Sequence, residues 1–242
     1  MSASRGQLAH GYVLHTRPWR NTSMLVEAFT ADAGRLGLVA RGVRRRGSTT
    51  RACLEPFQPL LLSWSGRGEL YTLTAVEAER WRAAPSGPAL LAAFYCNELI
   101  VRLLGREDVN GEAFGAYDVA VTALASGEPT AVTLRRFELE LLDALGFAPP
   151  LAVDAESGQW VDPDAQYDFF PEHGPIMARG PASDAVARVP GSHLLALATH
   201  RLEDPEVLRS ALRVLRASLA PLLGSKPLKS RELYRSMYRG ER

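Results

Sequence analysis

The chain is 242 residues long, and 46% of it is apolar, which is enough for a packed core and excludes a wholly disordered protein. Its net charge of +1 at pH 7 argues against a uniformly basic nucleic-acid binder. No apolar run approaches the roughly 18 residues that cross a bilayer, and the first residues lack the apolar stretch of a signal peptide. Cys53 and Cys96 are too few for a disulfide framework. We therefore expect a cytoplasmic protein with reduced thiols.

The charges are distributed unevenly along the chain. Residues 1–82 hold twelve basic and six acidic side chains, residues 83–180 hold five and fifteen, and residues 181–242 hold eleven and six. Two basic regions around an acidic middle suit an anionic ligand. The alternative is that the three segments neutralise one another in the fold, and the sequence leaves both interpretations open.

The first third of the chain has the pattern of short strands. Segments rich in β-branched, aromatic and leucine residues, separated by Gly, Asp, Asn and Pro, predict strands over residues 11–15, 24–29, 35–41, 57–64 and 69–75. The turn at 32–34 is typical of a tight hairpin in which Gly34 takes a positive φ. Because five short strands suit a small closed barrel, we predict an OB-fold domain over residues 1–82.

The hydrophobic period then changes to that of helices. It predicts helices over residues 88–104, 111–125 and 130–145. Thr130 is the expected N-cap of the third helix, and Gly146 its C′ residue. A last long helix is expected to begin at Asp204, with Pro205 in its first position. Its predicted core stripe consists of Leu208, Leu212, Leu215, Leu219 and Leu222.

Residues 147–192 are rich in Pro, Gly and acids and show little helical period, which predicts an irregular or small β insert. Oxygen ligands alternate from Asp162 to Asp168, but the Gly and Glu that an EF-hand requires are missing, so a polar loop is expected there. The predicted fold class is α+β. An OB barrel is followed by an α-helical domain over 83–242, with the insert at 147–192 and a C-terminal helix and basic tail over 204–242.

The segment 41–51 carries five arginines and no acid. Guanidinium groups bind phosphate in a bidentate fashion, so the segment predicts a nucleic-acid contact, with a solvated loop as the alternative. Gly42 and Gly47 have the spacing of a P-loop, but the lysine that nucleotide hydrolysis needs is absent. The predicted DNA-binding residues of the barrel are Arg17, Arg20, Arg35, Arg41, Arg44, Arg45, Arg46 and Arg51.

A second basic group lies near the C-terminus. Cations with interleaved Tyr234 and Tyr238 suit phosphate contact and base stacking, although an amphipathic helix with a solvated tail explains each feature alone. The DNA-binding residues predicted here are Arg209, Arg213, Arg216, Lys226, Lys229 and Arg231, and the tail adds Arg235, Arg239 and Arg242. The sequence has no GxSxG, HExxH or CxxC motif, which leaves only catalytic residues dispersed along the chain as an open alternative. Our expectation is no enzyme activity, catalytic residue, metal site or cofactor.

Several strings resemble one family over nearly the whole chain. They are VLHTRPW at 13–19, FT at 29–30, GR at 34–35, LVARGVRR at 38–45, LEPF at 54–57, LLL at 60–62, YCNEL at 95–99, LRRFEL at 134–139 and GSKPLKSR at 224–231. In this order and spacing they resemble the bacterial recombination mediator family RecO.

The resemblance implies a DNA repair and recombination protein of the RecF pathway. Such a protein binds single- and double-stranded DNA, anneals complementary strands and, with RecR, helps load the recombinase RecA onto DNA coated with the single-strand-binding protein SSB. The resemblance also implies a functional link to RecF, a cytoplasmic, nucleoid-associated location and no membrane partner. Two other classes stay open: an OB-fold targeting module of a nucleic-acid enzyme, and an RNA-binding factor.

The resemblance further implies that the acidic C-terminal tail of SSB, which ends in phenylalanine, docks on the helical domain. At 100° per residue, Arg135, Leu139 and Leu142 form a second stripe on the helix predicted over 130–145. The predicted SSB-tail residues are Arg135, Arg136, Leu139 and Leu142. The alternative is that Leu139 and Leu142 pack on a neighbouring helix and that Arg135 is solvated. Arg136 has a rival role in a surface ion pair with Glu140, four residues later.

The insert departs from many relatives, which carry two Cys-x-x-Cys pairs there and bind zinc. Asp154 and Ser157 align with the first pair, and Met177 and Gly180 with the second. Since no thiolate remains, the chain resembles the zinc-free branch of the family.

Overall fold

The computed structural model describes residues 8–46, 48–180 and 187–238. The chain forms two compact units: unit 1 consists of Met1–Glu128 and Pro227–Arg242, and unit 2 of Pro129–Lys226. Unit 2 is thus an insertion between two parts of unit 1. Among the helices described, none combines the length and the apolar character needed to cross a membrane.

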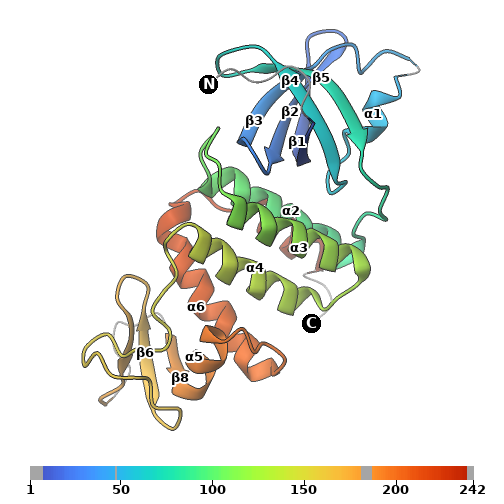
Figure 1. Cartoon of the computed structure of the whole chain (residues 1–242). Helices are drawn as coiled ribbons and strands as arrows, with labels where there is room; N and C mark the ends of the chain where they lie inside the picture. Colours follow the sequence, from blue (N-terminus) through green and yellow to red (C-terminus); the bar gives the residue numbers. More distant parts are fainter. Residues whose placement is uncertain (1–7, 47, 181–186, 239–242) are drawn as a thin grey trace. The chain divides into compact units, whose positions relative to one another are not determined.

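Unit 1 begins with a closed five-stranded barrel, drawn in blue to green in Figure 1. The strands pair in the order β1-β2-β3-β5-β4, in which only β3 and β5 are parallel. This architecture confirms the predicted OB-type barrel. The strands are β1 (Ala9–Trp19), β2 (Ser23–Thr30), β3 (Gly34–Ala40), β4 (Leu60–Ser65) and β5 (Tyr71–Ala78), with the short helix α1 (Thr50–Cys53) between β3 and β4. Gly34 has φ +64° as expected, whereas β4 begins after residue 57 because Phe57, with φ +70°, has no strand conformation.

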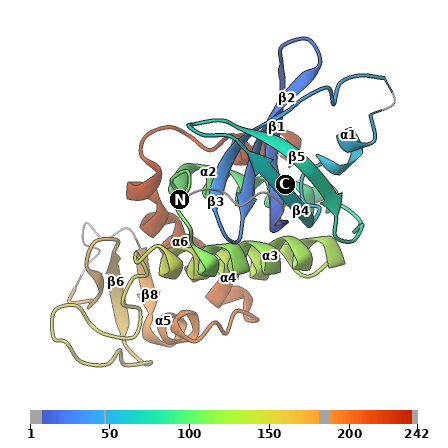
Figure 2. The same ribbon diagram turned by 45° about the horizontal axis from the view of Figure 1, so that its top comes forward.

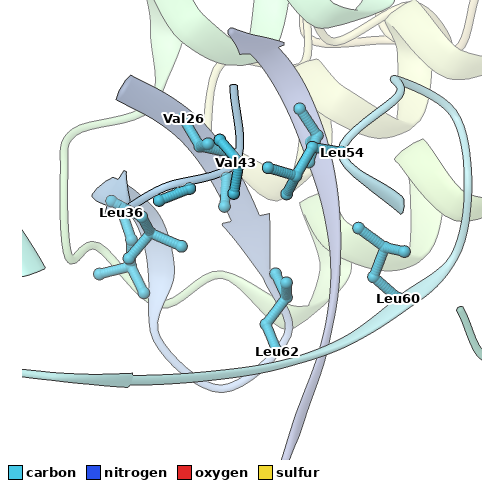
Figure 3. Packing of buried hydrophobic residues seen from close by; sticks show 10 residues of the cluster. Val26, Leu36, Val43, Leu54, Leu60 and Leu62 are labelled. Carbon is cyan, nitrogen blue, oxygen red and sulfur yellow. The ribbon is translucent and has the colours of Figure 1, made fainter. Parts of the chain in front are cut away.

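The barrel is filled by aliphatic side chains that alternate inward along the strands. Val26, Leu36 and Leu62 belong to this cluster, and so do Val43 and Leu54, which come from the segment between β3 and β4 (Figure 3). Val43 is 3% exposed and Leu54 2% exposed. The segment between β3 and β4 is therefore anchored in the barrel core at both of these positions.

Besides α1, the described residues of the barrel's unit form the helices α2 (Gly87–Leu103), α3 (Gly111–Ser126) and α7 (Lys229–Tyr238). The views in Figure 1 and Figure 2 show α2 and α3 against the barrel. Asn97 Nδ2 donates to the carbonyl of Leu14 at 2.7 Å, and the Tyr117 hydroxyl donates to Asn97 Oδ1 at 2.6 Å. The Tyr12 hydroxyl donates to Asp118. With these bonds, α2 and α3 belong to the same compact unit as the barrel.

A buried ion-pair network also joins the barrel to α2. The carboxylate of Glu27, on β2, accepts from Arg35 Nη2 at 2.6 Å and from Arg106 Nη2 at 2.7 Å. Arg35 Nη1 donates to the carbonyl of Val101 at 2.7 Å and to that of Leu104. These carbonyls lie at the C-terminal end of α2, where the helix leaves acceptors without an intrahelical partner and favours a cation. Arg35 therefore links a barrel carboxylate to a helix end.

Unit 2 combines helices with a small sheet. Its elements are α4 (Thr130–Ala144), β6 (Gln166–Phe170), β7 (Gly174–Met177), β8 (Ala187–Pro190), α5 (Gly191–Ala198) and α6 (Pro205–Leu223). The strands pair in the order β7-β6-β8, so the predicted insert contains a three-stranded sheet, and α4 and α5 both pack against α6. The Asp204 side chain accepts from the amide of Glu206 at 2.7 Å, which confirms the expected N-cap of α6.

Some local predictions for the helices are wrong. Thr130 is the first residue of α4 and not its N-cap, which is Pro129 and has no side-chain acceptor. Leu212 is 39% exposed, because Val207, Ala211 and Val214 fill the core stripe of α6. The helical character of α5 and α7 was not predicted.

We predict that Glu27→Gln lowers the free energy of unfolding by about 3 kcal/mol, because it leaves two guanidinium groups facing a neutral amide. Burial alone would raise the pKa of Glu27, but hydrogen bonds from Arg106 and Arg35 and their charges outweigh burial and hold the pKa below its usual value. A carboxyl group whose pKa is lower in the folded state than in the unfolded state stabilises the fold. This stabilisation is fully present above the pKa of the unfolded state and is lost as the pH falls through the pKa of the folded state.

The measurement is urea unfolding followed by circular dichroism between pH 7 and roughly pH 3, across the range in which carboxylates titrate. Wild-type stability falls on acidification more steeply than that of Glu27→Gln. Glu77→Gln, at an exposed position of β5, serves as the control and keeps the wild-type pH dependence. Equal acid sensitivity of wild type and Glu27→Gln contradicts the role of this network.

Candidate nucleic-acid interface

The arginine-rich segment leaves β3 at Ala40 and makes a tight turn. Gly42 has φ +71°, a conformation that glycine adopts without strain, and the amide of Arg45 donates to the Gly42 carbonyl at 3.0 Å. Because Val43 is buried in the barrel, the arginines around it are directed outward. Arg41, Arg44, Arg45 and Arg46 are exposed, as is Arg51 in α1.

The turn between β1 and β2 is hydrogen-bonded to this segment. The amide of Arg44 donates to the Thr22 carbonyl at 2.9 Å, and Arg44 Nη1 donates to the Arg20 carbonyl at 3.3 Å. Arg20 lies in the β1–β2 turn with φ +48°, and its guanidinium carbon is 5.9 Å from the Trp19 ring centroid. Arg44 thus joins the turn to the segment. We call the exposed arginines of β1, this turn and the segment the arginine surface; it consists of Arg17, Arg20, Arg41, Arg44, Arg45, Arg46 and Arg51.

The arginine surface has the properties of a phosphate-binding site. All seven side chains are exposed, and none forms an ion pair with a carboxylate in the part of the chain that the structure describes. Exposed guanidinium groups offer planar pairs of donors to phosphate oxygens. Trp19 adds an aromatic ring beside these cations, which suits stacking with a base.

Arg35 was predicted to belong to this site, and the structure contradicts that prediction. Its side chain is 11% exposed and is committed to Glu27 and to the end of α2. A phosphate contact would require breaking a buried ion pair. The sequence could not separate Arg35 from its exposed neighbours, because its partners lie far along the chain.

Arg67 was not assigned to the site from the sequence. It lies in the turn between β4 and β5, where residues 66–70 are all exposed. The β4–β5 loop is one of the two loops that OB folds commonly use for nucleic acids, the other being the β1–β2 turn. The Ser-Gly-Arg-Gly string at 65–68 has the glycines of a turn, and the arginine within it is the signal that could have added this residue.

The second basic group divides between the two units. Arg209, Arg213 and Arg216 lie exposed on α6 in unit 2 and form a basic stripe as predicted. Arg209 pairs with Glu206 in the preceding turn, and an exposed pair of this kind contributes about 0–1 kcal/mol, so it does not prevent a phosphate contact. Lys226 is also exposed and ends unit 2.

The other cations of this group lie on α7 in unit 1. Lys229 and Arg235 are exposed, whereas Arg231 is partly buried against Tyr95, with Nη2 donating to the tyrosine hydroxyl at 3.1 Å. Its guanidinium carbon lies 5.3 Å from the Tyr95 ring centroid. Arg231 therefore helps to pack α7 on α2. Arg239 and Arg242 lie outside the described residues.

The residues predicted to bind the SSB tail lie on α4. Arg135, Leu139 and Leu142 are 8%, 7% and 0% exposed, so the expected open stripe is wrong. Arg135 Nη2 instead donates to Glu138 Oε1 at 2.8 Å, because the glutamate three residues later lies on the same buried side. Arg136 is partly exposed.

The insert is held together by a carboxylate where zinc-binding relatives carry cysteines. Asp154, 3% exposed, accepts through Oδ1 from the amides of Glu156 and Ser157 at 2.9 and 2.8 Å, and through Oδ2 from the amide of Met177 at 2.8 Å. Burial alone would raise the pKa of Asp154, but these hydrogen bonds outweigh it and lower the pKa. Without thiolates, and with both carboxylate oxygens used, these residues do not fit a structural zinc ion. Across residues 8–46, 48–180 and 187–238, no cluster of His, Cys, Asp and Glu could hold a metal.

The fold and the site define an OB-fold protein with an attached helical domain and an exposed cationic surface suited to phosphate. Comparison with known proteins identifies the family. The model for "Recombination protein O N terminal" matches residues 7–81, and that for "Recombination protein O C terminal" matches residues 85–232. The chain belongs to the RecO family of DNA repair proteins, which confirms the resemblance seen in the sequence.

Individual relatives match along almost their whole length. The DNA repair protein RecO of Methylococcus capsulatus is 43% identical over 233 residues, covering 96% of this chain and 95% of the relative. The protein of the same name from Azoarcus sp. is 42% identical over 228 residues, covering 93% and 94%. That of Klebsiella pneumoniae is 42% identical over 226 residues, covering 93% and 91%.

Proposed function

We propose that this protein binds single- and double-stranded DNA and anneals complementary strands. We further propose that, with RecR, it helps load RecA onto SSB-coated DNA in the RecF pathway. The observation that carries the DNA-binding part is the arginine surface, where seven exposed guanidinium groups lie on a hairpin and a segment that are hydrogen-bonded to each other.

Electrostatics supplies the mechanism of annealing. Two complementary strands repel each other through their phosphates, and cations that neutralise phosphate release condensed counterions and reduce this repulsion. The contacts are made to the backbone and not to base edges, so binding is independent of sequence. Guanidinium groups stay protonated at neutral pH and cannot serve as general bases. We therefore propose that the protein acts by binding alone and is not an enzyme.

A second cationic site, on α6, supports annealing of two strands rather than binding of one strand alone. The basic stripe Arg209, Arg213 and Arg216 lies on α6 in unit 2, whereas the arginine surface lies in unit 1. In this proposal one strand occupies the arginine surface and the other contacts α6. The connection between the units keeps the two strands at high local concentration.

The test of the DNA site is a triple substitution, Arg44→Ala with Arg45→Ala and Arg46→Ala. Removing three phosphate contacts is expected to reduce the slope of log K against log salt for single-stranded DNA by about 2, at roughly 0.7 per contact. Fluorescence anisotropy with a labelled oligonucleotide at several NaCl concentrations gives both affinity and slope.

The matched control removes three exposed arginines from elsewhere, by Arg80→Ala, Arg179→Ala and Arg201→Ala. It changes the net charge equally but is expected to leave the slope close to that of wild type. If the two triple variants behave alike, net charge rather than the arginine surface governs binding.

For the acidic SSB tail, we propose a contact at Arg136 of α4, which is partly exposed and lies beside buried Arg135. A charge-assisted contact contributes about 1.5–3 kcal/mol to binding. Arg136→Ala is therefore expected to weaken the binding of a labelled tail peptide roughly tenfold or more. Arg201→Ala, also in unit 2, is the control. Unchanged peptide affinity in Arg136→Ala removes this residue from the partner site.

A further inference from the structure

The C-terminal helix α7 is held mainly by its first turn. Leu228, directly before the helix, and Ser230 are each 5% exposed, and Arg231 is partly buried against Tyr95. Every residue from Glu232 to Met237 is exposed. Since short helices gain most of their stability from packing, docking of α7 depends on the contacts around residues 228–231.

The carboxylate of Glu98, on α2, is the centre of these contacts. Its Oε1 accepts from the amide of Lys229 at 2.9 Å. Its Oε2 accepts from the amide of Ser230 at 2.9 Å and from the Ser230 hydroxyl at 2.7 Å. The first amides of a helix have no intrahelical acceptor, and here they find one on another helix. Glu98 thus caps α7 and fixes its start to α2, and the hydrogen bonds lower the pKa of the carboxyl although burial opposes this.

Docking of α7 determines whether the second chain connection between the two units ends in a packed helix. The chain enters unit 2 through the short connection between Ser126 of α3 and Thr130 of α4, and leaves it between Leu223 of α6 and Lys229 of α7. With α7 docked, both connections are anchored in unit 1. With α7 released, only the first connection ends in a docked helix.

We propose that Glu98 is a positioning residue for strand annealing, because its cap on α7 keeps unit 2 attached to unit 1 at both ends. This inference rests on the proposed function, in which one strand is held by each unit. Two anchored connections limit the orientations that the units sample, and loss of one makes productive encounters of the two strands rarer. The arginine surface, which holds one strand in this proposal, includes neither Glu98 nor any residue of α7, so its binding of a single strand does not depend on Glu98.

The test compares Glu98→Ala and Glu98→Gln with Glu128→Gln, an exposed carboxylate just after α3. Three quantities are measured on the full chain: hydrogen exchange of the α7 amides, Kd for a labelled single strand, and the rate of annealing of complementary labelled strands. In Glu98→Ala, α7 exchange is expected to rise, Kd to stay within about twofold, and annealing to slow by about three- to tenfold. Glu98→Gln keeps one acceptor and is expected to lie between Glu98→Ala and wild type.

A second variant tests the attachment without touching Glu98. A protease site inserted after Ser225, in the exposed stretch 224–227, allows the second connection to be cut while α7 keeps its cap. Cutting is expected to slow annealing as Glu98→Ala does, again without weakening single-strand binding.

Each outcome decides a separate part of the inference. Unchanged α7 exchange in Glu98→Ala overturns the cap. The positioning role is overturned if α7 exchange rises in Glu98→Ala while the annealing rate stays unchanged, or if the cut protein anneals strands at the wild-type rate. Either result leaves the proposed function standing. A wild-type protein that does not anneal overturns the proposed function and the positioning role together, while the exchange measurement still judges the cap.

Discussion

The buried carboxylate of Glu27 determines which arginines of the barrel can meet a ligand. A buried charge must be paired, and Glu27 takes two guanidinium groups, one of which also binds the end of α2. Arg35 is thereby committed to joining barrel and helices into one body. The exposed arginines of the β1–β2 turn and of residues 41–51 form no ion pair with a carboxylate among the described residues. They therefore remain available for phosphate.

The sequence predicts the barrel well because its strand pattern is local, and it predicts the arginine surface because that segment is so strongly cationic. It could not show that Arg35 is buried, since the carbonyls that Arg35 binds lie 66 and 69 positions away. Arg135 pairs with Glu138 only three residues later, but the sequence did not show that this side of α4 is buried. The spacing of the leucines in α6 predicts a helix but not which of its faces is buried, because Leu212 belongs to the predicted core stripe and is exposed. Local patterns define elements, whereas burial depends on contacts between distant residues.

The C-terminal segment gives the clearest example of a role that local pattern conceals. Residues 224–231 carried part of the family resemblance, and their cations suggested DNA contact. In the structure the Ser230 hydroxyl and the Lys229 amide donate to the carboxylate of Glu98, 132 and 131 positions away, and the guanidinium of Arg231 lies over the Tyr95 ring. Because unit 2 is inserted between α3 and α7, the arginine surface and the basic stripe of α6 belong to units that the chain connects twice.

The central claim is that exposed arginines drive annealing through phosphate neutralisation alone. Stopped-flow fluorescence of two complementary labelled strands with the wild-type protein, without ATP and with or without Mg²⁺, tests it most directly. The account predicts annealing faster than the spontaneous reaction, slowing steeply between roughly 50 and 200 mM NaCl, with the strands intact afterwards. An annealing rate that is insensitive to salt, a requirement for ATP, or shortened strands would contradict it.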